Sequence, residues 1–185
     1  MILPIVAYGD PVLKREGEEI DKDYPFLGEL IENMWETMYK AEGVGLAAPQ
    51  VGKSIRLFMV DASPFEEEDP ELKDFKKVFI NPIILEEEGK EWSFNEGCLS
   101  IPAIREDVNR KPKITIEYYD ENWELKEEIY EGMAARVIQH EYDHVEGILF
   151  TDKIKPLRKR LLATKLNNIS KGNVKVPYRM KFPKK

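Results

Sequence analysis

The sequence predicts an α+β domain in which mainly antiparallel sheets pack around a central helix. Two observations support this fold class. Several strand-like runs precede one strongly helical segment near residue 140, without regular alternation of strand and helix. Two of these runs flank a short polar segment of the kind found in hairpin turns. With 185 residues, the chain is long enough for a single domain with a sizeable core.

Three helices are expected. The first spans residues 25–41, with Asp23 as its N-cap, because apolar residues recur there at helical spacing. The second spans residues 133–145 and ends before Gly147, a residue type that often follows a helix. The third spans residues 156–170. The apolar stripe of the first helix comprises Leu27, Leu30, Ile31, Met34, Met38 and Tyr39.

Strands are expected where β-branched and aromatic residues cluster. The first two candidates are residues 56–61 and 78–85. The next two, residues 114–119 and 125–130, alternate between apolar and polar side chains. The segment Asp120-Glu121-Asn122 between them is typical of a hairpin turn, so these two strands should pair in antiparallel fashion.

Two segments are expected to lie outside the regular elements. Residues 63–77 are acidic and contain prolines, which favours a surface loop or a single helical turn. Residues 171–185 contain basic residues and no acidic one, and are predicted to form an irregular or extended tail. The predicted organisation is therefore one domain over residues 1–170 followed by a basic tail.

Composition excludes several function classes. The net charge of −7 argues against a general nucleic-acid binder. No apolar run approaches the roughly 18–20 residues that span a bilayer, and the opening MILPIVAYGDP lacks the features of a signal peptide. The single cysteine, Cys98, excludes an internal disulfide and suits a reducing compartment. These features predict a cytoplasmic protein that is not attached to a membrane.

The stretch QHEYDH contains both histidines of the chain, His140 and His144. Four residues apart on a helix, they share one face and can bind one metal ion, with Glu141 beside them. Two surface histidines are the simpler alternative. However, two histidines placed at random in such a chain would be four apart only about 1% of the time, which favours a metal site.

A third ligand has to come from elsewhere, because no other histidine exists. Downstream, Glu146 and Asp152 are candidates of the kind used by HExxH metallopeptidases. The alternative is Cys98 in the stretch NEGCLS, although a lone cysteine is most often a small core residue. A thiolate beside an incomplete metal site is a suitable ligand. We therefore expect Cys98, His140 and His144 to bind the metal.

The stretch EGVGLAAPQ, residues 42–50, combines two glycines with small apolar residues. It does not have the spacing of a phosphate-binding loop, and a helix precedes it where a nucleotide fold has a strand. A helix end followed by a turn would explain Gly43 but not Gly45. Small residues allow a backbone to approach another group closely, and Gln50 could donate a hydrogen bond to a carbonyl or oxyanion.

Taken together in this order and spacing, EGVGLAAPQ, EGCLS and QHEYDH resemble the three signature motifs of peptide deformylase. The resemblance covers about residues 1–155. It implies a hydrolase that removes the N-formyl group from nascent polypeptides beginning with formyl-methionine. It also implies ferrous iron as the metal, with nickel, cobalt or zinc able to substitute, and sensitivity to oxidation.

The resemblance further implies roles for individual residues. A metal-bound water would be the nucleophile, and Glu141 the general base. Gln50 and the backbone N–H of Leu99 would polarise the formyl oxygen. Substrate contacts would come from Val44 and Gly45, which would bind the peptide main chain as an added strand. Arg105 would also contact the substrate; the alternative is that it is only a solvent-exposed charge.

Helical spacing makes Met133 and Val137 candidate walls of a methionine pocket beside His140. Arg136 has two alternative roles. It could partly close this pocket or make its mouth more polar, or its aliphatic stem could lie on the pocket while its charged group extends into solvent. The resemblance does not extend to the long basic C-terminal helix of some family members, which is associated with ribosome docking. The positive charge of the tail keeps a contact near the ribosomal exit tunnel as a hypothesis. Two other functions stay open: an HExxH metallopeptidase with Cys98 free, and a non-catalytic peptide-binding relative.

Overall fold

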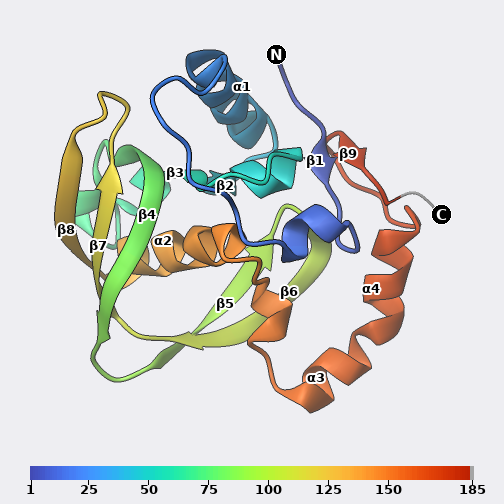
Figure 1. The fold of residues 1–185 in the computed structure, drawn as a ribbon. Helices are drawn as coiled ribbons and strands as arrows, with labels where there is room; N and C mark the ends of the chain where they lie inside the picture. The colour runs from blue at the N-terminus through green and yellow to red at the C-terminus, as the bar shows by residue number, and fades with distance from the viewer. Residues whose placement is uncertain (184–185) are drawn as a thin grey trace.

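Helix α2 (Gly132–Val145) lies at the centre of the computed structural model, which describes residues 1–183. A five-stranded antiparallel sheet lies on one side of it and the β5–β6 hairpin on another (Figure 1). The sheet order is β2-β3-β4-β7-β8. Its strands are Gly45–Ala47, Leu57–Asp61, Lys76–Glu88, Lys113–Tyr119 and Leu125–Glu131. The predicted α+β class with mainly antiparallel sheets is confirmed.

The main core lies between α2 and this sheet. Apolar residues of α2, among them Ala135, Ile138 and Val145, pack against Phe58 of β3 and Phe79 of β4, whose rings stack 4.7 Å apart. All five side chains are buried. Because each fully buried large apolar side chain contributes about 1.5–3 kcal/mol, this contact holds α2 firmly. The opposite face of α2 carries polar residues toward the hairpin.

The hairpin consists of β5 (Trp92–Cys98) and β6 (Ile101–Arg110). A third, two-stranded sheet joins segments far apart in sequence: β1 (Ile5–Val6) and β9 (Met180–Lys181) pair in parallel (Figure 1). The tail that was expected to be irregular or extended therefore contributes a strand. The proposed division of the chain at residue 170 stays a prediction.

Helix boundaries differ from the prediction in two places. Helix α1 spans Leu27–Lys40, and its N-cap is Phe26 in a left-handed conformation, not Asp23. The expected third helix is two helices, α3 (Pro156–Leu161) and α4 (Ala163–Ser170), which meet at Leu162. They lie on the side of the molecule away from the five-stranded sheet (Figure 1).

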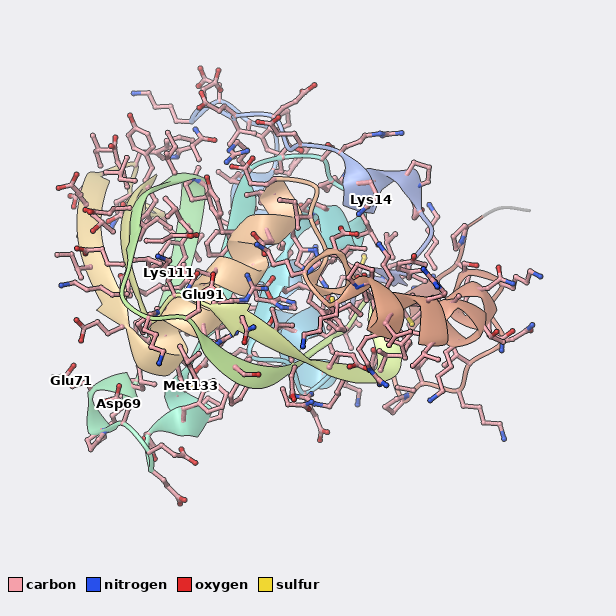
Figure 2. The ribbon with its side chains drawn as sticks, turned by 90° about the horizontal axis from the view of Figure 1, so that it is seen from below. Lys14, Asp69, Glu71, Glu91, Lys111 and Met133 are labelled. Atoms are coloured by element: carbon pink, nitrogen blue, oxygen red, sulfur yellow. The ribbon has the colours of Figure 1, made fainter. Side chains whose placement is uncertain are left out.

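Gly147 ends α2 as expected, for two physical reasons. Its φ of 75° is rarely adopted by L side chains, and a Cβ there would lie 2.8 Å from the Lys14 carbonyl oxygen. Residues 63–77 contain two short 3-10 turns, Ser63–Phe65 and Pro70–Leu72, instead of one. In Figure 2 this segment, marked by Asp69 and Glu71, projects from the body of the molecule. Within residues 1–183, no helix has the length and apolar character needed to cross a bilayer.

Candidate metal centre

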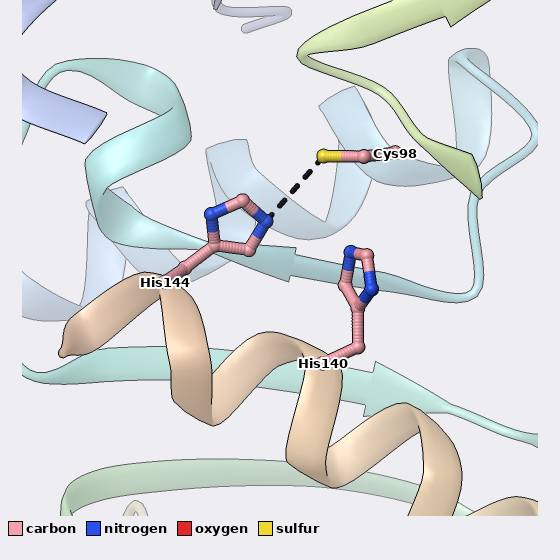
Figure 3. Close-up of side chains that lie close together, drawn as sticks. All are labelled: Cys98, His140 and His144. Atoms are coloured by element: carbon pink, nitrogen blue, oxygen red, sulfur yellow. Dashed lines mark hydrogen bonds between the residues drawn. The ribbon is translucent and has the colours of Figure 1, made fainter. Parts of the chain in front are cut away.

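Three potential metal ligands converge between α2 and the hairpin. His140 and His144 project from the same face of α2 toward Cys98, the last residue of β5 (Figure 3). One ligand atom from each residue lies within 4.8 Å of the other two, and the Cys98 Sγ is 3.4 Å from the His144 Nε2. Helix α2 is fixed by its apolar face, so both imidazoles are held toward the thiol.

The donor chemistry fits a metal cation. Glu96 Oε1 lies 2.9 Å from the His140 Nδ1, which leaves the other ring nitrogen of His140 free for a metal. Burial lowers the pKa of His140, but hydrogen bonding to Cys98 and Glu96 outweighs this effect and raises it to about 10. The groups around His140 therefore favour a positive charge between the three candidate ligands, and a bound metal cation would supply one. Burial instead lowers the pKa of His144, which keeps its ring neutral and able to bind a metal.

Glu96 is the centre of a buried polar network. Both of its oxygens accept from Arg110, at 2.7 and 3.0 Å, and Oε2 also accepts from the Arg136 Nη1 at 2.7 Å. Arg110 donates in addition to Asp143 of α2 at 2.7 Å. Burial would raise the pKa of Glu96, but hydrogen bonds and opposite charge from His140 and Arg110 outweigh it and hold this pKa well below its usual range. Glu96 is therefore a fixed anion that orients His140.

Arg136 does not place its charge in solvent, so that alternative is wrong. Its side chain is buried, and besides Glu96 its guanidinium donates to the carbonyl oxygens of Val108 and Trp92 at 2.8 and 2.7 Å. It also lies 4.3 Å from the centre of the Trp92 ring. Three acceptors on the hairpin offset only part of the cost of removing this charge from water, because burial still lowers the pKa of Arg136 and its Nε has no partner within the described residues.

Glu141 lies against the glycine-rich strand β2. A Cβ at Gly45 would be 2.7 Å from both Cγ and Oε1 of Glu141, so only glycine lets the two segments come this close. The Glu141 Oε2 is buried and has no hydrogen-bond partner within the described residues. Burial raises the pKa of Glu141 to about 7, which suits a group that exchanges protons near neutral pH.

Gln50 faces Cys98 from a short 3-10 turn, Ala48–Val51. Its Oε1 accepts from the Ala47 N–H at 3.0 Å, which fixes the orientation of the amide. Its Nε2 therefore points to the hairpin tip, 3.2 Å from the Ser100 Oγ and 3.5 Å from the Cys98 Sγ. Leu99 follows Cys98 in this tip. The donors of Gln50 and Leu99 thus lie beside the candidate metal ligands.

A cavity of about 700 Å³ opens onto these groups. All the residues expected to contact substrate line it: Val44, Gly45, Arg105, Met133 and Val137. Arg105 donates to the Asn95 side-chain and main-chain oxygens, at 2.9 and 2.8 Å, and stays exposed at the cavity wall. The structure therefore brings candidate residues from each of the three motifs around one cavity.

Several further residues of the site were given no role from the sequence. Glu96 could have been found, because it lies two residues before Cys98 and so faces the same side of the strand. Arg110 is distant in sequence and gives no comparable signal. Phe65, from the segment 63–77, and Tyr178, from the tail, also line the cavity. Their presence depends on long-range folding that a local pattern does not show.

Comparison with known proteins agrees with this geometry. The family model described as polypeptide deformylase matches residues 2–160. The chain belongs to this family. Proteins named peptide deformylase from Christiangramia forsetii and Flavobacterium psychrophilum are 65% and 63% identical to it. The first match covers 99% of this chain and 97% of the relative, and the second covers 100% of both.

Solved peptide deformylases have the same fold. A Plasmodium falciparum structure has a TM-score of 0.81 and 37% identity, covering 91% of this chain and 95% of that one. A Legionella pneumophila structure has a TM-score of 0.81 and 35% identity, covering 94% and 98%. Peptide deformylases are metal-dependent hydrolases that remove the formyl group of nascent peptides, so the chain is an enzyme of this class.

Proposed function

We propose that this chain hydrolyses the N-formyl group of nascent polypeptides that begin with formyl-methionine, using a divalent metal held by Cys98, His140 and His144. The observation that carries the proposal is the convergence of these three ligands, with Cys98, His140 and Glu141 lining one cavity. The metallopeptidase alternative requires Glu146 or Asp152 as a ligand. In the structure Glu146 instead pairs with Arg56, and Asp152 with two lysines.

We propose ferrous iron as the physiological metal because the resemblance to peptide deformylases implies it. A site of one thiolate and two imidazoles also suits nickel, cobalt and zinc, which could substitute. When bound, such an ion acts as a Lewis acid that makes water nucleophilic near neutral pH. A thiolate ligand also explains why oxidation should inactivate the enzyme. A reduced Cys98 supports a location in the cytoplasm.

The protein residues then have separate tasks. Glu141 accepts a proton from the attacking water at its unpaired Oε2 and later delivers one to the leaving amine. The Gln50 Nε2 and the Leu99 N–H donate hydrogen bonds to the formyl oxygen as negative charge develops on it. Loss of one such donor typically raises the barrier by about 3 kcal/mol.

Substrate binding uses the free edge of the large sheet. Strand β2 is the first strand in the order β2-β3-β4-β7-β8, so its outer edge has no partner strand within residues 1–183. A peptide can add to this edge at Val44 and Gly45, which line the cavity. Met133 and Val137 then form apolar walls for the methionine, and Arg105 faces the part of the peptide further from the formyl group.

Formate release from formyl-Met-Ala-Ser tests this function. Anaerobically purified protein loaded with Fe²⁺ or Ni²⁺ should release formate, and Glu141→Ala and Cys98→Ala should abolish it. Glu146→Gln is the control, because it changes the rival ligand and should retain most of the activity. Cleavage of a peptide bond instead, or full activity without Cys98, would refute the proposal.

Charge distribution supports a ribosomal partner as well. Residues 153–185 contain 12 of the 28 basic residues and no acidic residue, so the other 152 residues carry 16 basic and 35 acidic side chains. Helices α3 and α4 belong to this basic region and lie away from the sheet (Figure 1). Nucleic-acid backbones attract such a region without sequence specificity. Cosedimentation with ribosomes should weaken in Lys159→Glu/Arg160→Glu/Lys165→Glu, and unchanged cosedimentation would contradict the contact.

A further inference from the structure

The tip of the β5–β6 hairpin is held by both ends of the described chain. Leu99 and Ser100 form this tip, because Cys98 pairs with Ile101. The Ser100 carbonyl oxygen accepts from the Tyr8 N–H at 2.9 Å, and the Leu99 carbonyl oxygen accepts from the Tyr178 hydroxyl at 2.7 Å. Two adjacent carbonyls are thus each fixed from a different segment.

These two segments are also fixed to each other. Tyr8 follows strand β1, and Tyr178 precedes strand β9, its parallel partner. The Ile5 N–H donates to the Arg179 oxygen at 3.0 Å, directly after Tyr178, and the Ala7 N–H donates to the Lys181 oxygen at 2.9 Å. Met180 packs against the same apolar cluster as strand β6. The Tyr178 hydroxyl is therefore presented from an anchored backbone.

Tyr178 also faces the reaction cavity. It lines the cavity together with Cys98 and Leu99, and its side chain is partly buried. The bond to the Leu99 carbonyl restricts rotation of the backbone between Leu99 and Ser100. Only the φ and ψ angles of Leu99 separate this carbonyl from the preceding peptide group, so fixing the carbonyl narrows the orientations open to the Leu99 N–H. An oxyanion donor is effective only when its direction is fixed before the reaction.

We propose that Tyr178 is a positioning residue that orients the Leu99 N–H toward the reacting carbonyl oxygen. This inference rests on the proposed deformylase function. Tyr178 acts through the backbone of Leu99 and does not itself touch the reacting atoms. The basic C-terminal segment accordingly has a role inside the site, separate from any contact of its charges with a partner.

Tyr178→Phe tests the proposal, because it removes the hydroxyl and keeps the ring in the cavity wall. Loss of a hydrogen bond of this kind should lower kcat by roughly threefold to tenfold. The KM for formyl-Met-Ala-Ser should stay within about twofold, because the oxyanion contact strengthens mainly in the transition state. Tyr39→Phe is the matched control: it removes a hydroxyl bonded to Asp61, away from the cavity lining, and should leave kcat unchanged.

Amide hydrogen exchange gives a readout that does not depend on activity. In metal-free protein, Tyr178→Phe should speed exchange of the Leu99 and Ser100 amides, while amides of α2 and the melting temperature stay near the wild-type values. Wild-type kcat per bound metal, or unchanged exchange at the hairpin tip, would overturn the proposal. Absence of formate release by the wild type would instead refute the deformylase function, and the exchange experiment would still decide the positioning role.

Discussion

The buried carboxylate of Glu96 offers the sharpest test of how the metal centre is built. Each of its oxygens receives two donors: Oε1 faces His140 and Arg110, and Oε2 faces Arg110 and Arg136. In Glu96→Gln the side chain keeps its shape but one oxygen becomes an NH₂ group. Whichever way the amide turns, this group meets two donors. The substitution therefore breaks two hydrogen bonds and removes the charge that both arginines face.

The magnitude follows from the burial of the network. Removing one member of a buried ion pair costs about 3–5 kcal/mol, and here the Arg110–Asp143 pair stays intact, so we expect about 3 kcal/mol. Loss of the group that orients a metal-binding histidine weakens metal affinity by about 10- to 100-fold. Both effects have one cause, so they should appear together.

Two measurements check this expectation. Denaturant unfolding of the metal-free protein gives the change in stability, and competition with a chelator gives the Ni²⁺ affinity. Glu106→Gln is the matched control, since Glu106 lies on the same hairpin and pairs with the half-exposed Arg158 of α3, a surface ion pair whose loss should change stability little. A Glu96→Gln protein with a stability loss no larger than the control and wild-type affinity for Ni²⁺ would refute the reasoning.

Two further predictions concern other parts of the fold. Gly45→Ala should lower kcat by at least about tenfold, because the new Cβ displaces the Glu141 carboxylate, whereas Gly28→Ala, in open space on α1, should leave kcat unchanged and stabilise the protein by about 0.5–1 kcal/mol. Steady-state kinetics and thermal unfolding measure both, and equal kcat values for the two variants would contradict the close contact. Asp152 joins Lys14, the Leu149 N–H and Lys159, and these bonds outweigh burial and lower its pKa. Asp152 should contribute about 1 kcal/mol to the free energy of unfolding. This contribution should be fully present above the ordinary pKa of an aspartate and should be lost as the pH falls through the lowered pKa of the folded protein. The difference in unfolding free energy between wild type and Asp152→Asn should therefore shrink in acid, and a constant difference would refute this assignment.

Local sequence patterns were informative wherever the structure depends on neighbours along the chain. The apolar periodicity of α2 and its final Gly147 located the helix that carries both histidines. The alternating pattern of β7 and β8 located their hairpin, with boundaries correct within one residue. In these segments the apolar residues recur at the period of the helix or strand and form one buried face. The sequence pattern therefore matches the packing.

Other features depend on contacts that no local pattern contains. Strand β6 was not expected, because it places a charged side chain, Arg110, in a buried polar network where a simple alternating pattern would have an apolar residue. The start of α1 after Phe26 depends on a left-handed residue that the polar Asp23 did not indicate. The solvent-exposed alternative for Arg136 was wrong because its acceptors on the hairpin come from residues 28 to 44 positions away.

The pairing of β1 with β9 sets an order of events during synthesis. Ile5 pairs with Met180, so the two partners are 175 positions apart (180 minus 5). Once residues 1–145 have left the ribosome, the chain can close α2 against its sheet and bring together the cysteine and both histidines before residue 178 emerges. The hydroxyl that fixes the hairpin tip arrives only with the final residues of the described chain. On the proposed assignment, this enzyme of nascent chains completes its own site late, after the candidate metal ligands are already in place.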